Sequence, residues 1–358
     1  MGGSSQRSYR SAVRAITRRA LHAREDMSAA PFVHLPALLE EFGVDCDTML
    51  RRAGIGSVRL GSADTRLTVE QVGRLGVVCE EATGCPHFGL LVGQRAGAAA
   101  AGLAAEFLGH AETVDRALRM FVAHLHIHDR GAAAALWLMA PRRARLAYVI
   151  YHPGTPGAAH IYDASLAILT GIMRRLRGSS WSPTAVLLPR ARPASVAPYR
   201  AAFRAPLRFD APIAAIDFPA AELELPLAGA SFDGQVRLEA LLAESAAVTA
   251  NSMTDAVLRA ITRMVFASRP SADRVAMAFG LTRRRLNDRL AAEGTTYSDL
   301  LADVRCEIAR QLLTETRLPA GDIAATLHYS SPGAFSRAFK EWTGSTPREL
   351  RWKAGRKR

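Results

Sequence analysis

The stretch SADRVAMAFGLTRRRLNDRL, residues 271–290, decides the fold of the C-terminal part of this chain. Ser271 has the short hydroxyl side chain that caps a helix N-terminus. Gly280 can adopt the left-handed backbone of a tight turn without steric cost, and Thr282 can cap the helix that follows. Apolar side chains then recur four residues apart from Leu286, so they share one face of that helix. The pattern predicts a helix, a tight turn and a second, short helix with a polar outer face.

The same pattern recurs in IAATLHYSSPGAFSRAFKEWTGSTPRELR, residues 323–351. Here residues 328–330 form the turn, which is one residue longer than the first, and Ser331 is the helix cap. Phe335 takes the inward position that Leu286 has 49 residues earlier. The chain therefore contains an internal duplication of a helix-turn-helix unit.

One helix is expected to join the two units. The stretch RLAAEGTTYSDLLADVRCEIARQLL, residues 289–313, has apolar side chains at helical spacing and predicts a helix from Tyr297 to Glu315. Its 19 residues span about 28 Å at ~1.5 Å per residue. Recognition helices read successive major grooves when they lie about 34 Å apart. Residues 251–358 are therefore predicted to be an all-α DNA-binding domain, and a helical bundle that binds no DNA is the alternative.

The charge of the chain is unevenly distributed. The 358 residues carry a formal net charge of +13, and the sequence pI is near 10.4. The last 108 residues hold 19 Lys and Arg against 11 Asp and Glu, so +8 of the +13 lies there. This asymmetry points to nucleic acid as the partner, although composition alone fits a solvated basic surface equally well.

Cysteine usage and hydropathy indicate the compartment. The four cysteines form no CxxC pair, and in a chain of this size they indicate buried thiols in a reducing environment. No apolar run reaches the ~18 residues that are needed to cross a bilayer. We therefore expect a cytoplasmic protein with no membrane partner.

The N-terminus has an unusual composition. Residues 1–26 contain six arginines and only scattered, small apolar side chains, without the apolar central block of a secretory signal. We expect residues 1–30 to be a disordered basic leader. An upstream start codon and an organelle transit peptide are the alternatives.

Residues 31–227 predict an α+β domain. Short amphipathic helices fill its first half. The spacing of apolar residues then changes to the alternation of β-strands, which predicts two strands, Ala132–Met139 and Arg145–Tyr151. A Pro-Arg-Arg turn separates them. A helix from residue 160 to residue 176 and further short strands follow. Residues 228–250 are expected to be a helical connector to the DNA-binding domain.

Three histidines are the strongest candidates for chemistry in this domain. On a strand, His124, His126 and His128 would share one face and could bind a metal, whereas on a helix only the first and the last would be neighbours. The interpretation we prefer is a helix C-terminus, where these side chains meet free carbonyl groups before Gly131. No GxSxG, Walker, GxGxxG or HExxH motif is present. The sequence therefore predicts no enzyme activity, no cofactor and no metal site.

The last hundred residues resemble the AraC/XylS family of bacterial transcription regulators, above all in residues 289–313 and 323–351. The upstream half is similar to one ligand-sensing domain of that family. That similarity lies in PFVHLPALLEEFGVDCDTMLRRAGI (31–55), HLHIHDRG (124–131) and LLPRARPASVAPYRAAFRAPLRFDA (187–211). The resemblance implies an effector-responsive regulator whose N-terminal domain is not of the sugar-binding cupin type.

The resemblance also implies roles for the outer faces of the two recognition helices. Base reading is expected at Arg284, Asn287, Asp288, Ser336 and Arg337. Arginine suits guanine, and asparagine suits adenine. Phosphate contacts, or simply solvated charges, are expected at Arg283, Arg285, Arg289 and Lys340.

Two residues depart from the family pattern. Asp288 stands where a basic residue is usual, and we expect it to pair with Arg284 or Arg285 rather than to accept a hydrogen bond from a cytosine amine. His328 replaces a glycine in the second turn, where it is expected to strain the backbone. Because Pro332 and Gly333 offer no hydrogen-bonding side chain, the second helix should contribute less to base reading than the first.

The expected partners are double-stranded promoter DNA, RNA polymerase and an unidentified small-molecule effector, and two chains could pair as a homodimer. We expect an activator. A constitutive DNA binder whose N-terminal domain only dimerises is one alternative. An enzyme fused to a DNA-binding domain is the other.

Overall fold

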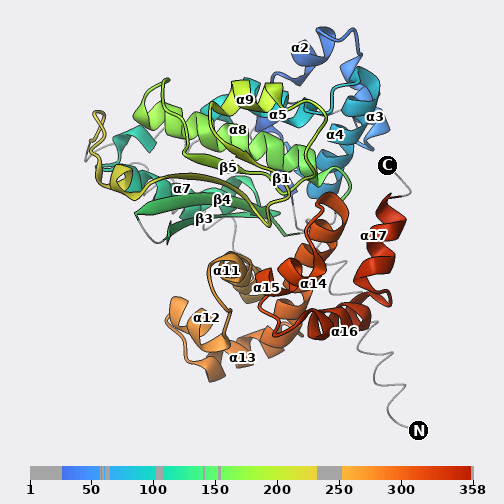
Figure 1. The fold of residues 1–358 in the computed structure, drawn as a ribbon. Helices are drawn as coiled ribbons and strands as arrows, with labels where there is room; N and C mark the ends of the chain where they lie inside the picture. Colours follow the sequence, from blue (N-terminus) through green and yellow to red (C-terminus); the bar gives the residue numbers. More distant parts are fainter. Residues whose placement is uncertain are drawn as a thin grey trace.

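The computed structural model describes residues 26–56, 58, 60, 65–101, 108–139, 142–151, 155–231 and 252–355. Residues 1–25 of the expected leader and residues 232–250 of the expected connector lie outside these ranges. An N-terminal α+β domain is followed by a helical C-terminal domain, as predicted (Figure 1). Strand β1 (Asp26–Ser28) lies inside the range assigned to the leader and pairs with β2 (Arg66–Thr68).

The N-terminal domain contains a five-stranded sheet with the strand order β3-β4-β7-β5-β6. Only the pair β5 and β6 is parallel. The strands are β3 (Ala132–Met139), β4 (Arg143–Ile150), β5 (Ala185–Leu187), β6 (Leu207–Arg208) and β7 (Ala214–Pro219). The sequence predicted the first strand with the same bounds, and β4 begins two residues earlier than predicted.

The described α-helices of this domain are α2 (Leu35–Glu40), α3 (Cys46–Arg52), α4 (Val69–Thr83), α5 (Phe88–Ala96), α7 (Val114–His128), α8 (Ala158–Arg177) and α9 (Ala197–Phe203). Of these, α7 packs against β3, and α4 and α5 pack against α8 rather than against the sheet. Side chains alternate along β4, so that Leu146 and Tyr148 enter the main core and Ala147 and Val149 face the other way. Helix α8 packs against the core face of β4 and β7.

Glycines allow α8 to approach α4 and α5 closely. A Cβ atom at Gly89 would lie 2.3 Å from the carbonyl oxygen of His160, and one at Gly76 would lie 2.7 Å from the Cβ atom of His160. Any side chain at these two positions would therefore push α8 away from its neighbours. Helix α5 was not predicted from the sequence.

The C-terminal domain consists of seven helices within residues 252–355. They are α11 (Met253–Ala267), α12 (Ala272–Ala278), α13 (Arg283–Ala292), α14 (Tyr297–Glu315), α15 (Ala320–Thr326), α16 (Pro332–Thr343) and α17 (Pro347–Gly355). The predicted caps are confirmed, because the side chains of Ser271, Thr282 and Ser331 each accept a hydrogen bond from the backbone three residues on. The joining helix α14 has the predicted bounds.

The two domains lie against each other. The outward face of the sheet carries an apolar patch that consists of Ala147, Val149, Ala185, Leu187, Ala211, Ile213 and Ala215. Phe266 of α11 packs against this patch, and Figure 1 shows α11 on the opposite side of the sheet from α8. No helix within the described ranges combines the length and the apolar character that a membrane span needs.

Candidate DNA-binding surface and ligand cavity

Helix α13 presents the expected reading face to solvent. Arg284, Asn287 and Asp288 are exposed, whereas Leu286 and Leu290 are fully buried. This split follows from the helical period, because residues four apart lie on one face. The expected phosphate-contacting residues of this helix are exposed as well, namely Arg283, Arg285 and Arg289.

The expected ion pair of Asp288 with Arg284 or Arg285 is absent among the described residues. Instead Arg283 lies 3.5 Å from a carboxylate oxygen of Asp273, and the side chains of both are more than half exposed. An exposed pair of this kind contributes little stability. The guanidinium group of Arg283 can therefore exchange this partner for a phosphate at low cost.

Helix α16 presents a less polar face than α13. Arg337 and Lys340 are exposed and Ser336 is partly exposed, while Phe335 and Phe339 are fully buried. The remaining exposed positions of its first turn are a proline and a glycine, which have no side-chain donor. The outer face of α16 is therefore exposed, but it offers fewer hydrogen-bonding side chains than that of α13. Its smaller contribution to base reading stays a prediction.

The turn of the second unit has the strained backbone that the sequence predicted. His328 has φ +59°, in the left-handed region, and Gly280 of the first unit has φ +63°. The Nε2 atom of His328 donates a hydrogen bond to the carbonyl oxygen of Val265 over 2.8 Å. The next residue, Tyr329, has the guanidinium of Arg305 over its ring at 5.0 Å. The turn is thus held to both α11 and α14.

Besides sharing a hydrophobic core with α11, the first unit is linked to it by a carboxylate. Glu293, the residue after α13, accepts hydrogen bonds from the backbone N–H groups of Met253 and Thr254, each over 2.8 Å. These are two of the unpaired donors at the start of α11. Burial raises the pKa of Glu293, but these hydrogen bonds outweigh it and lower the pKa below its usual value.

A contact between α8 and α14 was not predicted from the sequence. The hydroxyl of Tyr162, on α8, donates a hydrogen bond to Oε1 of Gln311, on α14, over 3.3 Å, and both side chains are buried. Nearby, the backbone N–H of Ala191 donates to the carbonyl oxygen of Glu315 over 2.7 Å. The one feature of the sequence that could have indicated this contact is Gln311, a polar residue within the helix that joins the two DNA-binding units.

The segment that contains Ala191 is fixed by α8 as well. Arg190 forms a buried ion pair with Asp163 of α8, and the hydroxyl of Tyr199 donates to the same carboxylate over 2.6 Å. A further link joins the domains beyond α14, where the backbone N–H of Arg317 donates to Asp210 over 2.7 Å. Helix α8 therefore contacts α14 directly through Tyr162, and through Asp163 it fixes the segment whose Ala191 contacts the end of α14.

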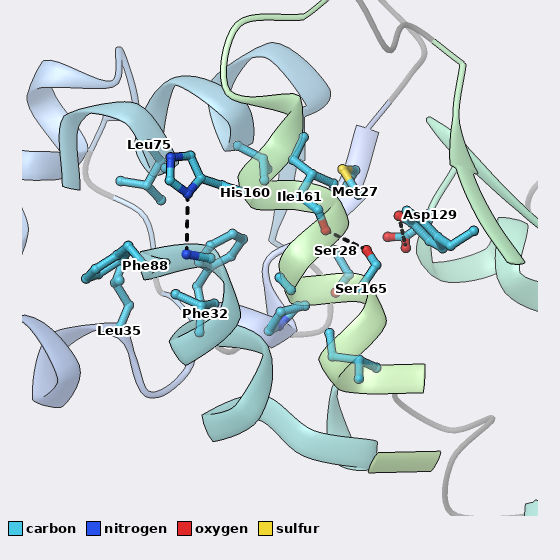
Figure 2. Close-up of a pocket in the computed structure, with 18 residues that line it drawn as sticks. Met27, Ser28, Phe32, Leu35, Leu75, Phe88, Asp129, His160, Ile161 and Ser165 are labelled. Atoms are coloured by element: carbon cyan, nitrogen blue, oxygen red, sulfur yellow. Dashed lines mark hydrogen bonds between the residues drawn. The ribbon is translucent and has the colours of Figure 1, made fainter. Parts of the chain in front are cut away.

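The same helix lines a cavity on another of its faces. The cavity has a volume of about 60 Å³ and lies among β1, α2, α4, α5 and α8 (Figure 2). Most of its lining is apolar, and the largest of these side chains are Phe32, Leu35, Leu75, Phe88 and Ile168. An apolar hollow with a few polar groups is the common form of a small-molecule site.

Besides the hydroxyls of Ser28, Tyr148 and Ser165, a carboxylate and an imidazole lie on the cavity wall. Asp129 follows α7 and accepts a hydrogen bond from the hydroxyl of Tyr148 over 3.0 Å. His160 is buried, its Nδ1 atom accepts from the N–H of Gly89 over 3.4 Å, and its Nε2 atom lies 2.8 Å from Glu80. Figure 2 shows Asp129 on one side of the pocket and Phe88 and Leu35 on the other.

The histidines that the sequence singled out lie on α7, so the strand arrangement is wrong. The helix ends at His128, as the helix-end interpretation expected, and the Nδ1 atom of His124 donates to the carbonyl oxygen of Met120, one turn earlier in the helix, over 2.8 Å. Burial lowers the pKa of His128. Within the described ranges, no group of three His, Cys, Asp or Glu side chains is placed to hold a metal ion.

Two family models match the chain. The model described as "Arabinose-binding domain of AraC transcription regulator, N-term" matches residues 43–227, and a helix-turn-helix domain model matches residues 275–353. The first match covers more than half of the chain and contains the cavity-lining helices α4, α5 and α8. The second contains both recognition helices.

Curated relatives match over nearly the whole length. The ornithine utilization regulator of Pseudomonas aeruginosa is 28% identical over 330 residues, which cover 90% of this chain and 96% of the relative. The transcriptional regulator VirS of Mycobacterium tuberculosis is 26% identical over 320 residues, which cover 88% of this chain and 93% of the relative. Among solved structures, the transcriptional regulator CdpR of Pseudomonas aeruginosa aligns over 85% of this chain and 96% of its own, with a TM-score of 0.43 and 23% identity.

Proposed function

This chain belongs to the AraC family of DNA-binding transcription regulators, and we propose that it reads two successive major grooves of a promoter under the control of a small molecule. The observation that carries the two-groove proposal is the single 19-residue helix α14 between two units whose reading faces are exposed. One chain then provides the spacing that many regulators obtain by dimerisation.

The roles of individual residues follow from their places on the two faces. Arg284 and Asn287 are proposed to read guanine and adenine edges in one groove, with Asp288 beside them. Arg337, next to Ser336, is proposed to read the neighbouring groove. The surrounding cations are proposed to hold the DNA backbone, at Arg283, Arg285, Arg289 and Lys340.

Control by an effector is supported by the position of α8. One face of this helix lines the cavity through Ile161 and Ser165, and another carries Tyr162 toward Gln311 of α14. A molecule that enters the cavity and shifts α8 would therefore change a contact of the helix that joins the DNA-binding units. Such a coupling requires that the ligand favours one of two arrangements of the domains.

We further propose that this regulator is a cytoplasmic activator that contacts RNA polymerase from its promoter site. A homodimer is compatible with the proposal, because a second chain would add binding energy at a neighbouring site. Neither proposal is needed for the reading of two grooves by one chain.

Chemical footprinting of the major groove tests the two-groove proposal. The full-length protein is bound to the promoter region of a neighbouring gene, and guanine N7 methylation protection is mapped on both strands. We expect two protected segments per bound chain, centred about 10 base pairs apart. A single protected segment would contradict the proposal.

Operator affinity, measured with and without a panel of small metabolites, tests the control by an effector. We expect at least one compound to change the dissociation constant about 5- to 150-fold, the range of ordinary allosteric coupling. If no compound changes the operator affinity or the melting temperature, the regulator is constitutive.

A further inference from the structure

We infer that the cavity beside α8 binds a small apolar molecule with one positively charged amino group, and that the Asp129 carboxylate holds this amine. The inference rests on the proposed control by an effector, because it names the chemistry of the molecule at that site. It is carried by the contrast between an apolar lining and one carboxylate that lacks an ion-pair partner among the described residues.

The cations nearest to Asp129 are engaged elsewhere. Arg66 pairs with Asp26 at 2.5 Å, and Arg130 lies 3.5 Å from the other oxygen of the same carboxylate. Asp26 and Asp129 thus lie close together, but both arginines form their ion pairs with Asp26. The hydrogen-bond donors to Asp129 are the hydroxyl of Tyr148 and the backbone N–H of Ser28, and both are neutral.

This arrangement is costly for the folded protein. Burial raises the pKa of Asp129 to about 6, against the smaller effects of Tyr148 and Arg66. A charged carboxylate at neutral pH is therefore less stable here than in water. The side-chain oxygen of an asparagine could accept hydrogen bonds from Tyr148 and Ser28 without this cost, so these contacts alone do not account for a carboxylate. A bound ammonium group would account for a carboxylate at this position, because it neutralises the negative charge within the cavity.

The rest of the cavity defines the body of the ligand. Phe32, Leu75, Phe88 and Ile168 offer apolar contact and no hydrogen bonds from their side chains. The volume of about 60 Å³ accommodates only a few heavy atoms unless the pocket widens or the ligand extends into its mouth. A short alkyl chain that ends in an amine fits these limits, whereas an acid of the same length would place like charges together.

Binding of n-butylamine to the full-length protein tests the inference, with butan-1-ol and butyrate as ligands of matched size. Dissociation constants are obtained from the rise in melting temperature with ligand concentration at pH 7.5. We expect n-butylamine to bind about tenfold more tightly than butan-1-ol, since a hydrogen bond to a charged group is stronger than a neutral one. Butyrate should give no stabilisation. Equal affinity for the amine and the alcohol would overturn the inference.

Variants separate the carboxylate from the rest of the pocket. In Asp129→Asn, the preference for the amine should be lost while butan-1-ol binds as before. Asp115→Asn is the matched control, because Asp115 lies on the surface of α7 and pairs with Arg119. That variant should keep the preference, as should Tyr148→Phe, which retains the carboxylate. An amine preference that survives in Asp129→Asn would overturn the inference.

The pH dependence of the wild type gives a readout that does not depend on the folding of a variant. Protonation of Asp129 as the pH falls through about 6 removes the charge that holds the amine, so n-butylamine affinity should fall between pH 7.5 and pH 5. The charged and titratable groups around it are Asp26, Arg66, His128, Arg130 and Tyr148. Protonation of His128 would add a cation and lower the affinity in the same direction. Amine affinity that is unchanged at pH 5 would overturn the inference.

Operator affinity in the presence of n-butylamine distinguishes this inference from the proposed function. Selective amine binding that depends on Asp129, without a change in operator affinity, supports the ligand site and contradicts control by that ligand. A change in operator affinity with other metabolites, combined with no amine preference, supports control and overturns the amine inference.

Discussion

The two helix-turn-helix units share an architecture but differ in what holds them in place. The second unit contains an aromatic cluster in which Tyr329, Phe335, Phe339 and Trp342 lie with ring centroids 5.8–6.4 Å apart. The first unit has two buried leucines on its recognition helix and no such cluster among its described residues. Yet the first unit exposes more hydrogen-bonding side chains on the face that is proposed to read bases.

This difference suggests a division between two tasks, namely fixing a unit on the rest of the domain and presenting side chains to the DNA bases. Aromatic packing and the hydrogen bond of His328 to α11 fix the second unit on the scaffold. The first unit carries Arg284 and Asn287 on a helix that Glu293 connects to α11. We therefore expect the second unit to contribute more to stability and the first to contribute more to sequence recognition.

The largest expected effect is on the packing of the second unit. Phe339→Ala removes a fully buried ring and should lower the free energy of unfolding of the DNA-binding domain by about 3–5 kcal/mol. Leu290→Ala is the matched change in the first unit, and we expect a loss near the lower end of about 2–5 kcal/mol. Urea denaturation followed by tryptophan fluorescence measures both. A loss below about 1 kcal/mol for Phe339→Ala would show that the aromatic cluster does not anchor its unit.

An intermediate effect is expected in the turn of the second unit. His328→Ala keeps a non-glycine residue in the left-handed backbone conformation and removes the hydrogen bond to Val265. It should therefore lower the free energy of unfolding by about 0.5–1.5 kcal/mol. His328→Gly removes the same bond but relieves the backbone strain, and its melting temperature should be close to that of the wild type. If the glycine variant is destabilised as much as the alanine variant, strain is not a significant part of this turn.

The smallest effect is expected for the carboxylate that connects the first unit to α11. The lowered pKa of Glu293 means that its stabilisation is present above the usual glutamate value near 4.5 and is lost as the pH falls through the lower, folded pKa. Glu293→Gln should therefore lower the melting temperature at pH 7, and the difference from the wild type should disappear in acid. A difference that is independent of pH would contradict the role of the charge.

Local patterns in the sequence were enough to predict the two helix-turn-helix units and the helix α14 that joins them, but not α11 or α17. Each unit has its cap, its turn and its inward residues within about twenty positions, and the cap of Thr282 or Ser331 needs only the backbone three residues on. The exposure of the predicted reading faces follows from helical period alone. What these residues do on DNA stays a prediction.

The cavity and the domain contact could not be predicted in the same way. Tyr162 and Gln311 are 149 residues apart, and nothing in the pattern of either helix specifies the other. Asp129 was placed near the end of a helix, but its position in a cavity depends on β1, β4 and α8 together. Such sites depend on tertiary packing of distant segments, which periodicity and capping signals do not encode.

The unequal reading faces are the central claim, and the operator affinities of Arg284→Ala and Arg337→Ala test it most directly. Each is measured by gel shift on the operator and on unrelated DNA at one salt concentration, with Arg283→Ala as the control for a phosphate contact. We predict that each reading variant loses ~1–3 kcal/mol of specific binding, with the larger loss for Arg284→Ala, while binding to unrelated DNA is unchanged. Arg283→Ala should instead weaken both kinds of binding alike. Operator binding at the wild-type level in both reading variants would contradict the account.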